Sequence, residues 1–252
     1  MASPEPNIHA EILKLARLLR VEPEELAYLE QVPGSDLGQL REQVADMLFS
    51  AHNQMLDKLA ASSRLLPVAL VALITERAFG PVLAARMAGV LEPPRAVAVA
   101  ARLPAAFLAD TARQLDPRRT RAIIGEIPAE RIEEIARVLA EHQDFVTMGQ
   151  AVGQLSSEAL RASLSALDDE MLLRTAFVMD DKDRLPELAE LLGHERLIGM
   201  IDVAERAGLE DEAIDLIAHL DDAQQTDLLA ALRERDQQAH QQVLDRLAKV
   251  SA

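Results

Sequence analysis

Apolar residues recur at intervals of twelve along much of this chain, and this spacing restricts the possible folds more than any other feature of the sequence. Three runs keep the interval: Leu91, Leu103, Leu115, Ile127 and Leu139; Leu155, Leu167, Met179 and Leu191; and Leu220, Leu232 and Leu244. A fixed period of this kind is typical of repeat proteins, whose units bury their apolar faces only against neighbouring units. The spacing therefore predicts an array of stacked units.

Within each block of twelve residues, the apolar positions follow a helical pattern. In the last block of the first run, Ile132, Ile135, Ala136 and Leu139 occupy positions 5, 8, 9 and 12. This spacing places them on one face of an amphipathic helix of about two turns. Proline or aspartate stands at the block boundaries, as at Asp116, where a capping side chain precedes a proline suited to the first helical turn. Each block therefore predicts one short helix.

The segment before the array has a different pattern. A Pro-Gly-Ser-Asp turn signal is followed by apolar residues along one face from Leu40 to Leu59, with no proline between them. At a rise of 1.5 Å per residue, this predicts one long helix over 36–63, roughly 40 Å in length. Such a helix either braces the array lengthwise or projects to pair with a second copy of the chain. We therefore predict an all-α protein with an N-terminal helical segment, 1–64, followed by a right-handed α-solenoid, 65–252.

Composition limits the alternatives. The 252 residues include no cysteine, which excludes disulfides, zinc–thiolate sites and thiol catalysis, and only six aromatic residues, so the core must consist of aliphatic side chains. The most apolar stretch, 65–74, is too short to span a bilayer, and no secretory signal is evident. We expect a cytoplasmic protein without a transmembrane segment. This stretch is most simply a buried helix; the alternative is a ligand groove or membrane-surface patch lined by Leu65, Val68, Val71 and Ile74.

The net charge of −16 is distributed unevenly. Residues 1–126 contain 14 Lys and Arg against 15 Asp and Glu, whereas residues 127–252 contain 12 against 27. Nucleic acid is not an expected partner, because binding to phosphates requires clustered cations. An acidic surface of this kind attracts a basic partner surface, collects divalent cations, or maintains solubility. We expect a protein partner with a basic surface.

Aspartates that follow the closing apolar residues are the candidate metal ligands. They are Asp168, Asp169, Asp180, Asp181, Asp183, Asp221 and Asp222. If the helices stack in parallel, these side chains form an acidic edge that binds Mg²⁺. The alternative is helix capping, in which one aspartate caps a helix and the next complements its dipole, and Asp180 with Asp183 resembles a capping box.

No motif of an enzyme is present in the sequence. The six histidines have no i, i+4 partner, no serine stands in Gly-x-Ser-x-Gly, and no glycine-rich phosphate loop occurs. We therefore expect no catalytic residues, and no cofactor apart from the Mg²⁺ of the hypothesis above.

The rhythm of Leu-Pro and Leu-Asp steps over residues 80–245 is similar to that of a known family. The run from Leu91 through Pro93, Pro94 and Arg95, followed by the Leu103-Pro and Leu115-Asp-Pro steps, resembles the N-terminal intracellular superhelical domain of MgtE-type magnesium transporters. The middle repeats of the flagellar switch protein FliG look similar. In the transporters, this resemblance implies, the domain is cytosolic and helps a magnesium-sensing unit to close the pore.

This sequence contains neither the sensor domain nor the pore of that family, so we do not expect it to transport ions by itself. We expect a non-enzymatic protein-interaction module, an adaptor or regulatory scaffold that presents an extended acidic surface. The alternative is a regulatory domain that responds to divalent cations.

Overall fold

The chain is all-helical in the computed structural model, which describes residues 7–50, 53–235 and 237–250 and contains no strand in those ranges. The helices are α1 (Ile8–Leu19), η1 (Pro23–Gln31), α2 (Gly34–Ser50), α3 (Asn53–Ser63), α4 (Val68–Ile74), η2 (Thr75–Phe79), α5 (Gly80–Ala88), α6 (Pro93–Ala100), α7 (Ala105–Ala112), α8 (Arg121–Ile124), α9 (Ala129–Glu141), α10 (Phe145–Val152), α11 (Ser157–Leu164), α12 (Asp169–Phe177), η3 (Lys182–Arg184), α13 (Leu185–Leu192), α14 (His194–Ala207), α15 (Glu210–Ala218), α16 (Asp222–Arg235) and α17 (Gln237–Val250).

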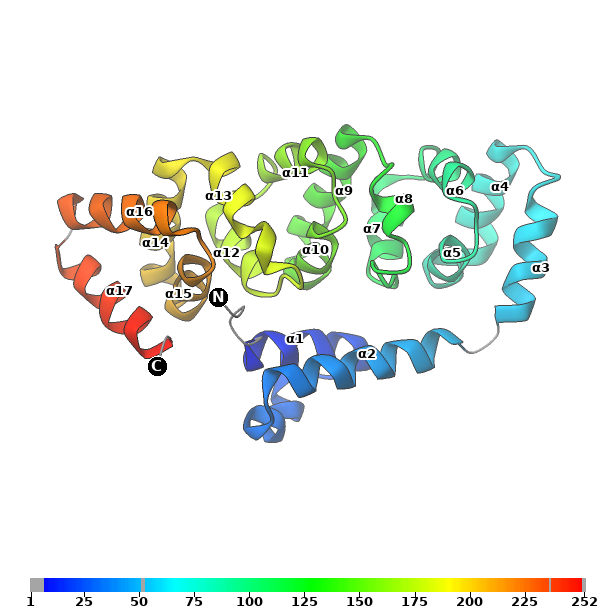
Figure 1. Cartoon of the computed structure of the whole chain (residues 1–252). Helices are drawn as coiled ribbons and strands as arrows, with labels where there is room; N and C mark the ends of the chain where they lie inside the picture. Colours follow the sequence, from blue (N-terminus) through cyan, green and yellow to red (C-terminus); the bar gives the residue numbers. More distant parts are fainter. Residues whose placement is uncertain (1–6, 51–52, 236, 251–252) are drawn as a thin grey trace.

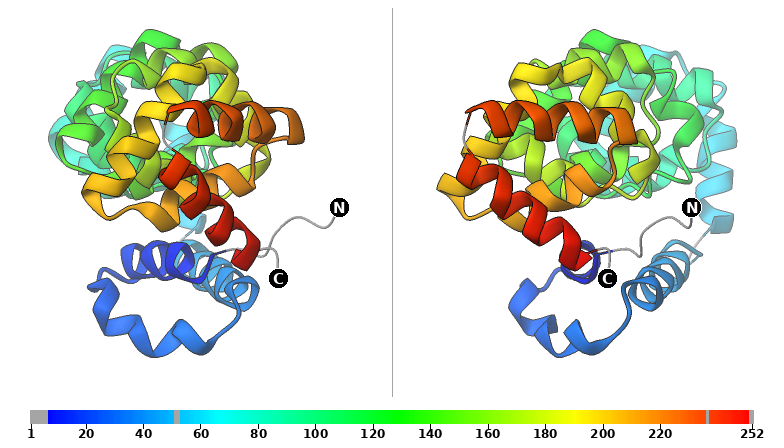
Figure 2. Two further views of the ribbon diagram at one scale, coloured as in Figure 1. Left: turned by 90° about the vertical axis from the view of Figure 1, so that its left-hand side faces the viewer. Right: turned by 60° about the vertical axis from the view of Figure 1, so that its left-hand side comes forward.

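Helices α4 to α17 follow one another along the long axis of the molecule (Figure 1), and we call them the array. Viewed from its end, the helices of the array are arranged around its long axis, while α1, η1 and α2 lie to one side (Figure 2). Helices separated by one other helix in the chain pack together: α7 against α9, α9 against α11, and α10 against α12. The largest apolar core extends from Ala109 to Leu232 and is therefore shared by successive helices.

Several helices begin where the sequence pattern placed them. Helices α6 and α7 start at Pro93 and Ala105, and α11 and α12 start at Ser157 and Asp169, twelve residues apart in each case. Proline at the start of α6 fits the first helical turn, where its missing N–H costs no hydrogen bond. These boundaries follow from local sequence.

The block that starts at Asp116 differs from the prediction. Its helix, α8, comprises only Arg121–Ile124, and Thr120, not Asp116, precedes it. Asp116 is buried, and its carboxylate accepts a hydrogen bond from the backbone N–H of Arg118 and forms ion pairs with Arg118 and Arg119. The expected cap is therefore wrong, because the aspartate binds side chains of the following turn in place of the helix start.

The predicted single helix over 36–63 is also corrected. The structure has two helices here, α2 and α3, whose axes run in different directions (Figure 1), and residues 51 and 52 lie outside the described residues. Ser50 and Asn53 flank the junction, and both residue types favour helix ends over helix interiors. Helix α2 lies alongside the array, while α3 stands at its end and contacts α5.

Helices α1, η1 and α2 form a small folded unit, which we call the strap. Ile12, Leu15 and Ala16 of α1 pack against Leu26 of η1 and Leu37 of α2, all buried. The strap therefore has an apolar core of its own beside the array. Of the two roles predicted for the long helix, bracing matches the position of α2.

Arginine side chains of the array bind the C-termini of earlier helices, including that of α3, through a recurring contact that we call the arginine clamp. The clamps that donate to two backbone carbonyls are Arg95 to Ser63 and Leu66, Arg184 to Val152 and Leu155, and Arg196 to Leu164 and Leu167. In all three, the acceptors lie 32 and 29 residues before the arginine. Arg131 makes a related bond to the carbonyl of Leu103, 28 residues earlier.

The clamps have a common physical cause. The last carbonyl groups of an α-helix have no partner within the helix, and a cation placed there also offsets the negative end of the helix dipole. Ser63, Val152 and Leu164 are the last residues of α3, α10 and α11. Each clamp therefore satisfies a helix end and fixes a later helix against it.

We expect Arg184→Ala to lower the free energy of unfolding by about 2–3 kcal/mol, because two carbonyls at the end of α10 lose a charged donor. Arg161→Ala is the matched control, since Arg161 is exposed and forms no ion pair with any described residue; its effect should stay within about 0.5 kcal/mol. Urea denaturation followed by circular dichroism measures both. Equal effects of the two substitutions would contradict a structural role for the clamp.

Candidate interaction sites

Two of the seven aspartates proposed as metal ligands cap helices. The carboxylate of Asp168 accepts from the backbone N–H of Met171 at 2.8 Å, at the start of α12. Asp221 accepts from the N–H of Gln224 at 2.8 Å, and the Gln224 side chain accepts in return from the N–H of Asp221 at 3.3 Å. This reciprocal pair is a capping box at the start of α16. Both carboxylates therefore have a structural role.

The other aspartates are not gathered at one point. Asp169 pairs with Arg196 at 3.0 Å, and Asp180 binds the strap, so the expected capping box of Asp180 with Asp183 is wrong. Asp181, Asp183 and Asp222 are exposed. Among the described residues, no group of three or more His, Cys, Asp or Glu side chains could hold a metal ion. A magnesium site at these residues stays a prediction.

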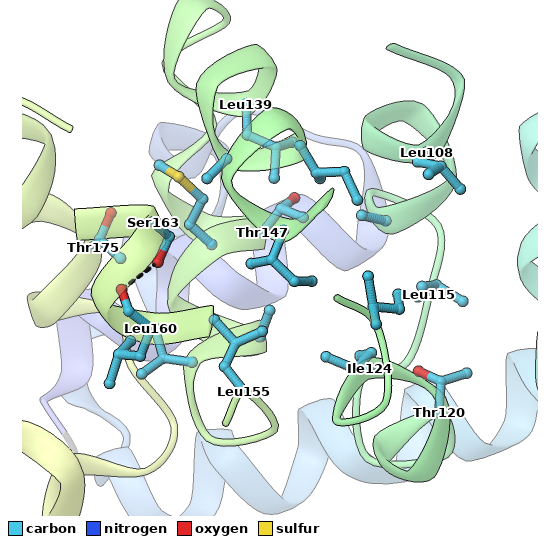
Figure 3. Close-up of a pocket in the computed structure, with 18 of the residues that line it drawn as sticks. Leu108, Leu115, Thr120, Ile124, Leu139, Thr147, Leu155, Leu160, Ser163 and Thr175 are labelled. Atoms are coloured by element: carbon cyan, nitrogen blue, oxygen red, sulfur yellow. Dashed lines mark hydrogen bonds between the residues drawn. The ribbon is translucent and has the colours of Figure 1, made fainter. Parts of the chain in front are cut away.

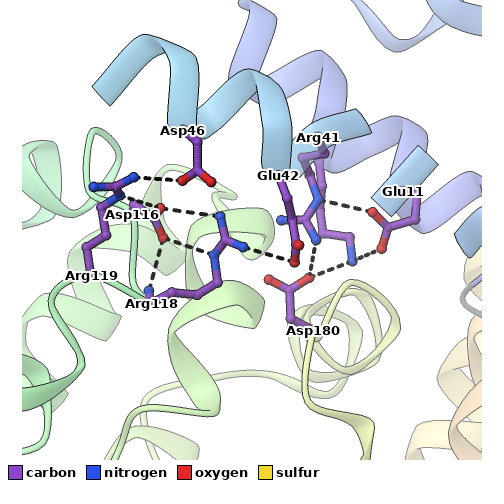
Figure 4. Close-up of polar contacts among 9 residues, drawn as sticks. Glu11, Arg41, Glu42, Asp46, Asp116, Arg118, Arg119 and Asp180 are labelled. Atoms are coloured by element: carbon purple, nitrogen blue, oxygen red, sulfur yellow. Dashed lines mark hydrogen bonds and ion pairs between the residues drawn. The ribbon is translucent and has the colours of Figure 1, made fainter. Parts of the chain in front are cut away.

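Asp180, whose side chain is 32% exposed, belongs to a charge cluster, buried at Lys14 and Glu11, that joins the strap to the array (Figure 4). Lys14 Nζ contacts the carboxylate of Glu11 and lies 2.8 Å from Asp180 Oδ1. Arg41 Nε lies 3.0 Å from Glu11 Oε2, and its Nη2 lies 3.0 Å from Asp180. The side chains of Lys14 and Glu11 are only 3% and 4% exposed. Two cations therefore alternate with two anions, so that each buried charge faces its opposite.

A second group of charges contacts α2 at Glu42, next to Arg41, and one turn further along at Asp46. Arg118 Nη1 lies 2.9 Å from Glu42 Oε1, and Arg119 Nη2 lies 2.7 Å from Asp46 Oδ1 (Figure 4). Burial opposes the charge of Arg118, but the hydrogen bond and negative charge of Asp116 outweigh it and raise the pKa of Arg118. Two arginines of the basic run 118–121 thus contact the strap.

Asp144 is the third link between strap and array. Its Oδ2 lies 2.6 Å from Arg17 Nη2 of the strap and 2.7 Å from Arg113 Nε of the array, while Oδ1 accepts from the N–H of Thr147 at the start of α10. Both arginines line a cleft of about 860 Å³ between α1 and the array. One carboxylate faces both, so much of their positive charge is already offset.

Apolar contact between the strap and the array is small by comparison. Ala10 and Leu13 of α1 meet Phe145, Phe177 and Val178 of the array. Charge pairs therefore determine much of how the strap is placed. Sequence analysis missed these residues, although Glu11 and Lys14 stand among the buried apolar residues of α1, which is a recognisable signal of buried charge.

Lys182 stabilises the segment 180–183 on the side that faces away from the strap. Its Nζ donates to the carbonyls of Ala176 and Phe177 at 2.7 Å each and pairs with Asp215 at 2.5 Å. Burial lowers the pKa of Lys182, and the nearby carboxylate of Asp215 opposes this shift. The segment 180–183 is thus held on one side by the strap, through Asp180, and on the other by α15, through Lys182.

Helix α4 lies at the end of the array (Figure 1), and large apolar side chains on α4 and in the segment just before it are exposed. We call Leu65, Leu66, Leu70 and Leu73 the α4 stripe; Leu65 is 88% exposed and Leu73 is 52% exposed. The opposite face of α4 buries Val71 against the neighbouring helices. The buried helix predicted for 65–74 is therefore only half correct, since its other face is uncovered.

The apolar segment is also longer than predicted. Val68–Ala88 is long and apolar enough to cross a membrane, by length and composition, and 28% of it is buried. Gly80, with φ of +69°, interrupts the helical path, and a proline follows it. A single such segment is weak evidence, because core helices of water-soluble proteins pass the same test. The absence of a transmembrane segment stays a prediction.

Comparison with protein-family models, with curated protein sequences and with solved structures finds no match. The similarity to the MgtE-type domain therefore depends only on the spacing of the Leu-Pro and Leu-Asp steps in the sequence.

We expect Lys14→Met to lower the free energy of unfolding by about 3–5 kcal/mol, because it leaves Glu11 buried without its main cation. Arg64→Ala is the control, since the Arg64–Glu92 pair is 62% exposed on both sides and contributes less than about 1 kcal/mol. Urea denaturation of the two variants tests this. A small and equal loss in both would show that the buried charge cluster does not hold the strap.

Proposed function

We propose that this chain is a non-enzymatic protein-interaction module, an adaptor or regulatory scaffold, built on a right-handed α-solenoid with a repeat of about twelve residues. The solenoid is supported by the arginine clamps, three of which share the same two sequence separations. The observation that carries the interaction role is the α4 stripe. Exposed clusters of large apolar side chains mark interaction surfaces.

The stripe fits an apolar helix of a partner. Leu70 and Leu73 lie three residues apart on α4, so both belong to the face along which two helices pack, and Leu65 and Leu66 stand just before the helix. Covering each leucine contributes about 1.5–3 kcal/mol at most, so three or four of them supply a substantial part of a binding energy. The partner helix is either that of another protein or α4 of a second copy of the chain.

The acidic half supplies a second surface in this proposal. Asp181, Asp183 and Asp222 are exposed and form no ion pair with any described residue, so their charge is available to a basic segment. Long-range attraction of this kind accelerates association more than it strengthens binding. We also propose a cytoplasmic location, which the lack of cysteine supports.

Site-specific photocrosslinking tests the α4 stripe. We expect a photoreactive phenylalanine analogue at Leu70 or Leu73, in the full chain expressed in its source cells, to give a discrete adduct. The same analogue at Ala61, an exposed residue of α3, is the control and should give none. An adduct of twice the mass identifies a second copy, and any other discrete mass identifies a different protein.

No adduct at either leucine, or equal labelling at Ala61, would mean that the α4 stripe is not an interaction surface. Labelling of lipid at the two leucines would replace the protein partner by a membrane surface.

A magnesium titration tests the cation-responsive alternative. Because Asp168 and Asp221 cap helices and Asp180 binds the strap, we expect MgCl₂ and NaCl at matched ionic strength to shift the Tm equally. A saturable rise specific to Mg²⁺, absent from Asp181→Asn/Asp183→Asn, would instead support a divalent-cation sensor.

A further inference from the structure

The cleft of about 860 Å³ between the strap and the array is large enough for a small organic ligand. Its walls are α1 and α2 on one side and α5, α10 and residues 113–118 on the other. The interior of the array has a different lining, since all the described residues around it are Leu, Ile, Val, Ala, Met, Thr or Ser (Figure 3). Of these two spaces in the described part of the chain, only the cleft offers cationic side chains to a ligand.

Most of the cations in the cleft wall already face carboxylates. The five that form such ion pairs are Lys14, Arg17, Arg41, Arg113 and Arg118. The carboxylate of Glu22 also lines the cleft, but it belongs to a capping box at the start of η1. These charges hold the fold together and therefore add little to the attraction of a ligand.

Two further arginines of the cleft have no carboxylate partner among the described residues. Arg20, which ends α1, donates to the neutral side chain of Gln114 at 2.6 Å. Arg86, on α5, forms neither an ion pair nor a side-chain hydrogen bond within the described ranges. An exposed apolar side chain accompanies each: Leu19 precedes Arg20, and Val82 lies one turn before Arg86. The strap and the array thus each supply one uncompensated guanidinium and one uncovered apolar side chain.

The backbone at Arg20 is also unusual for an arginine. Its φ is +60°, in the left-handed region where a helix end normally has glycine. Glycine would adopt this conformation with less strain, so the turn at the end of α1 does not itself require an arginine. The position of the side chain in the cleft provides a reason for it.

We propose that the cleft binds a small organic phosphate, a monoester whose phosphate pairs with Arg20 and Arg86 and whose apolar body covers Leu19 and Val82. A phosphate monoester carries close to two negative charges at pH 7, which matches two guanidinium groups. The planar set of N–H donors on arginine also suits phosphate oxygens. This binding activity is independent of the protein-interaction role.

Isothermal titration calorimetry of the full chain with three probes at pH 7.5 tests the proposal. The probes are 1-naphthyl phosphate, 1-naphthol, which lacks the charge, and glycerol 3-phosphate, which lacks the apolar body. We expect 1-naphthyl phosphate to bind at least about tenfold more tightly than either of the others, because it alone uses both the arginines and the apolar side chains.

Substitution of the two arginines tests their role. Arg20→Gly and Arg86→Gln should each weaken binding of 1-naphthyl phosphate about tenfold, through loss of a charged hydrogen-bond donor. Arg20→Gly should not lower the Tm, because glycine adopts a φ of +60° without strain, so its loss of affinity cannot come from unfolding. Arg161→Gln is the control: Arg161 is exposed and lies outside the cleft, and its substitution should leave the affinity unchanged.

A pair of substitutions at one position locates the bound molecule. Val82→Glu places a carboxylate beside Arg86 and should abolish binding, whereas Val82→Gln, which has the same shape without the charge, should retain most of it. Leu70→Ser/Leu73→Ser changes only the α4 stripe and should leave binding unchanged. Failure of the photocrosslinking experiment would not affect these results, so the two proposals can be distinguished.

Four results would overturn the proposal. They are the absence of saturable binding of 1-naphthyl phosphate, equal binding of either control probe, native affinity in Arg20→Gly and Arg86→Gln, and equal effects of Val82→Glu and Val82→Gln.

Discussion

In a short helix, a large fraction of the backbone carbonyl groups lies at the helix end, where no partner exists within the helix. The arginine clamps bind some of these carbonyl groups. A helix of eight residues, such as α10 or α11, is unstable alone in water and has four unsatisfied carbonyls at its end. At the ends of α10 and α11, a guanidinium from a helix about thirty residues later binds the carbonyl of the last residue and one carbonyl just beyond it. Because the side chain has a limited reach, the clamp also restricts how the later helix is placed against the earlier one.

The strap obeys a different rule. Its core is self-contained, its apolar contact with the array is small, and its buried charges are matched with opposite charges from both sides. Ion pairs in such settings contribute little net stability relative to apolar residues, but a mismatched position leaves a charge uncompensated. The charges therefore select one position of the strap along the array.

Sequence analysis was most successful where structure is local. The twelve-residue columns placed the starts of α6, α7, α11 and α12, because apolar periodicity and proline act within one helix. It failed at Asp180, whose partners lie on the strap, at Asp116, which binds the two arginines that follow it, and at 36–63, where apolar spacing continues across a helix boundary. The clamps had a visible signal: Arg95 and Arg131 both occupy the fourth position of their blocks. Apolar columns alone carry no information about that position.

Charge is distributed unevenly along the array. The α4 stripe lies at one end of the molecule, while residues 127–252, which hold most of the net negative charge, form the other (Figure 1). The chain is therefore a long electric dipole, and a dipole turns in an external field before any contact is made. A negatively charged object would meet the α4 end first, and a positively charged one would meet the acidic end. The order of charges along the chain thus orients the molecule as it approaches another charged body, whichever partner finally binds.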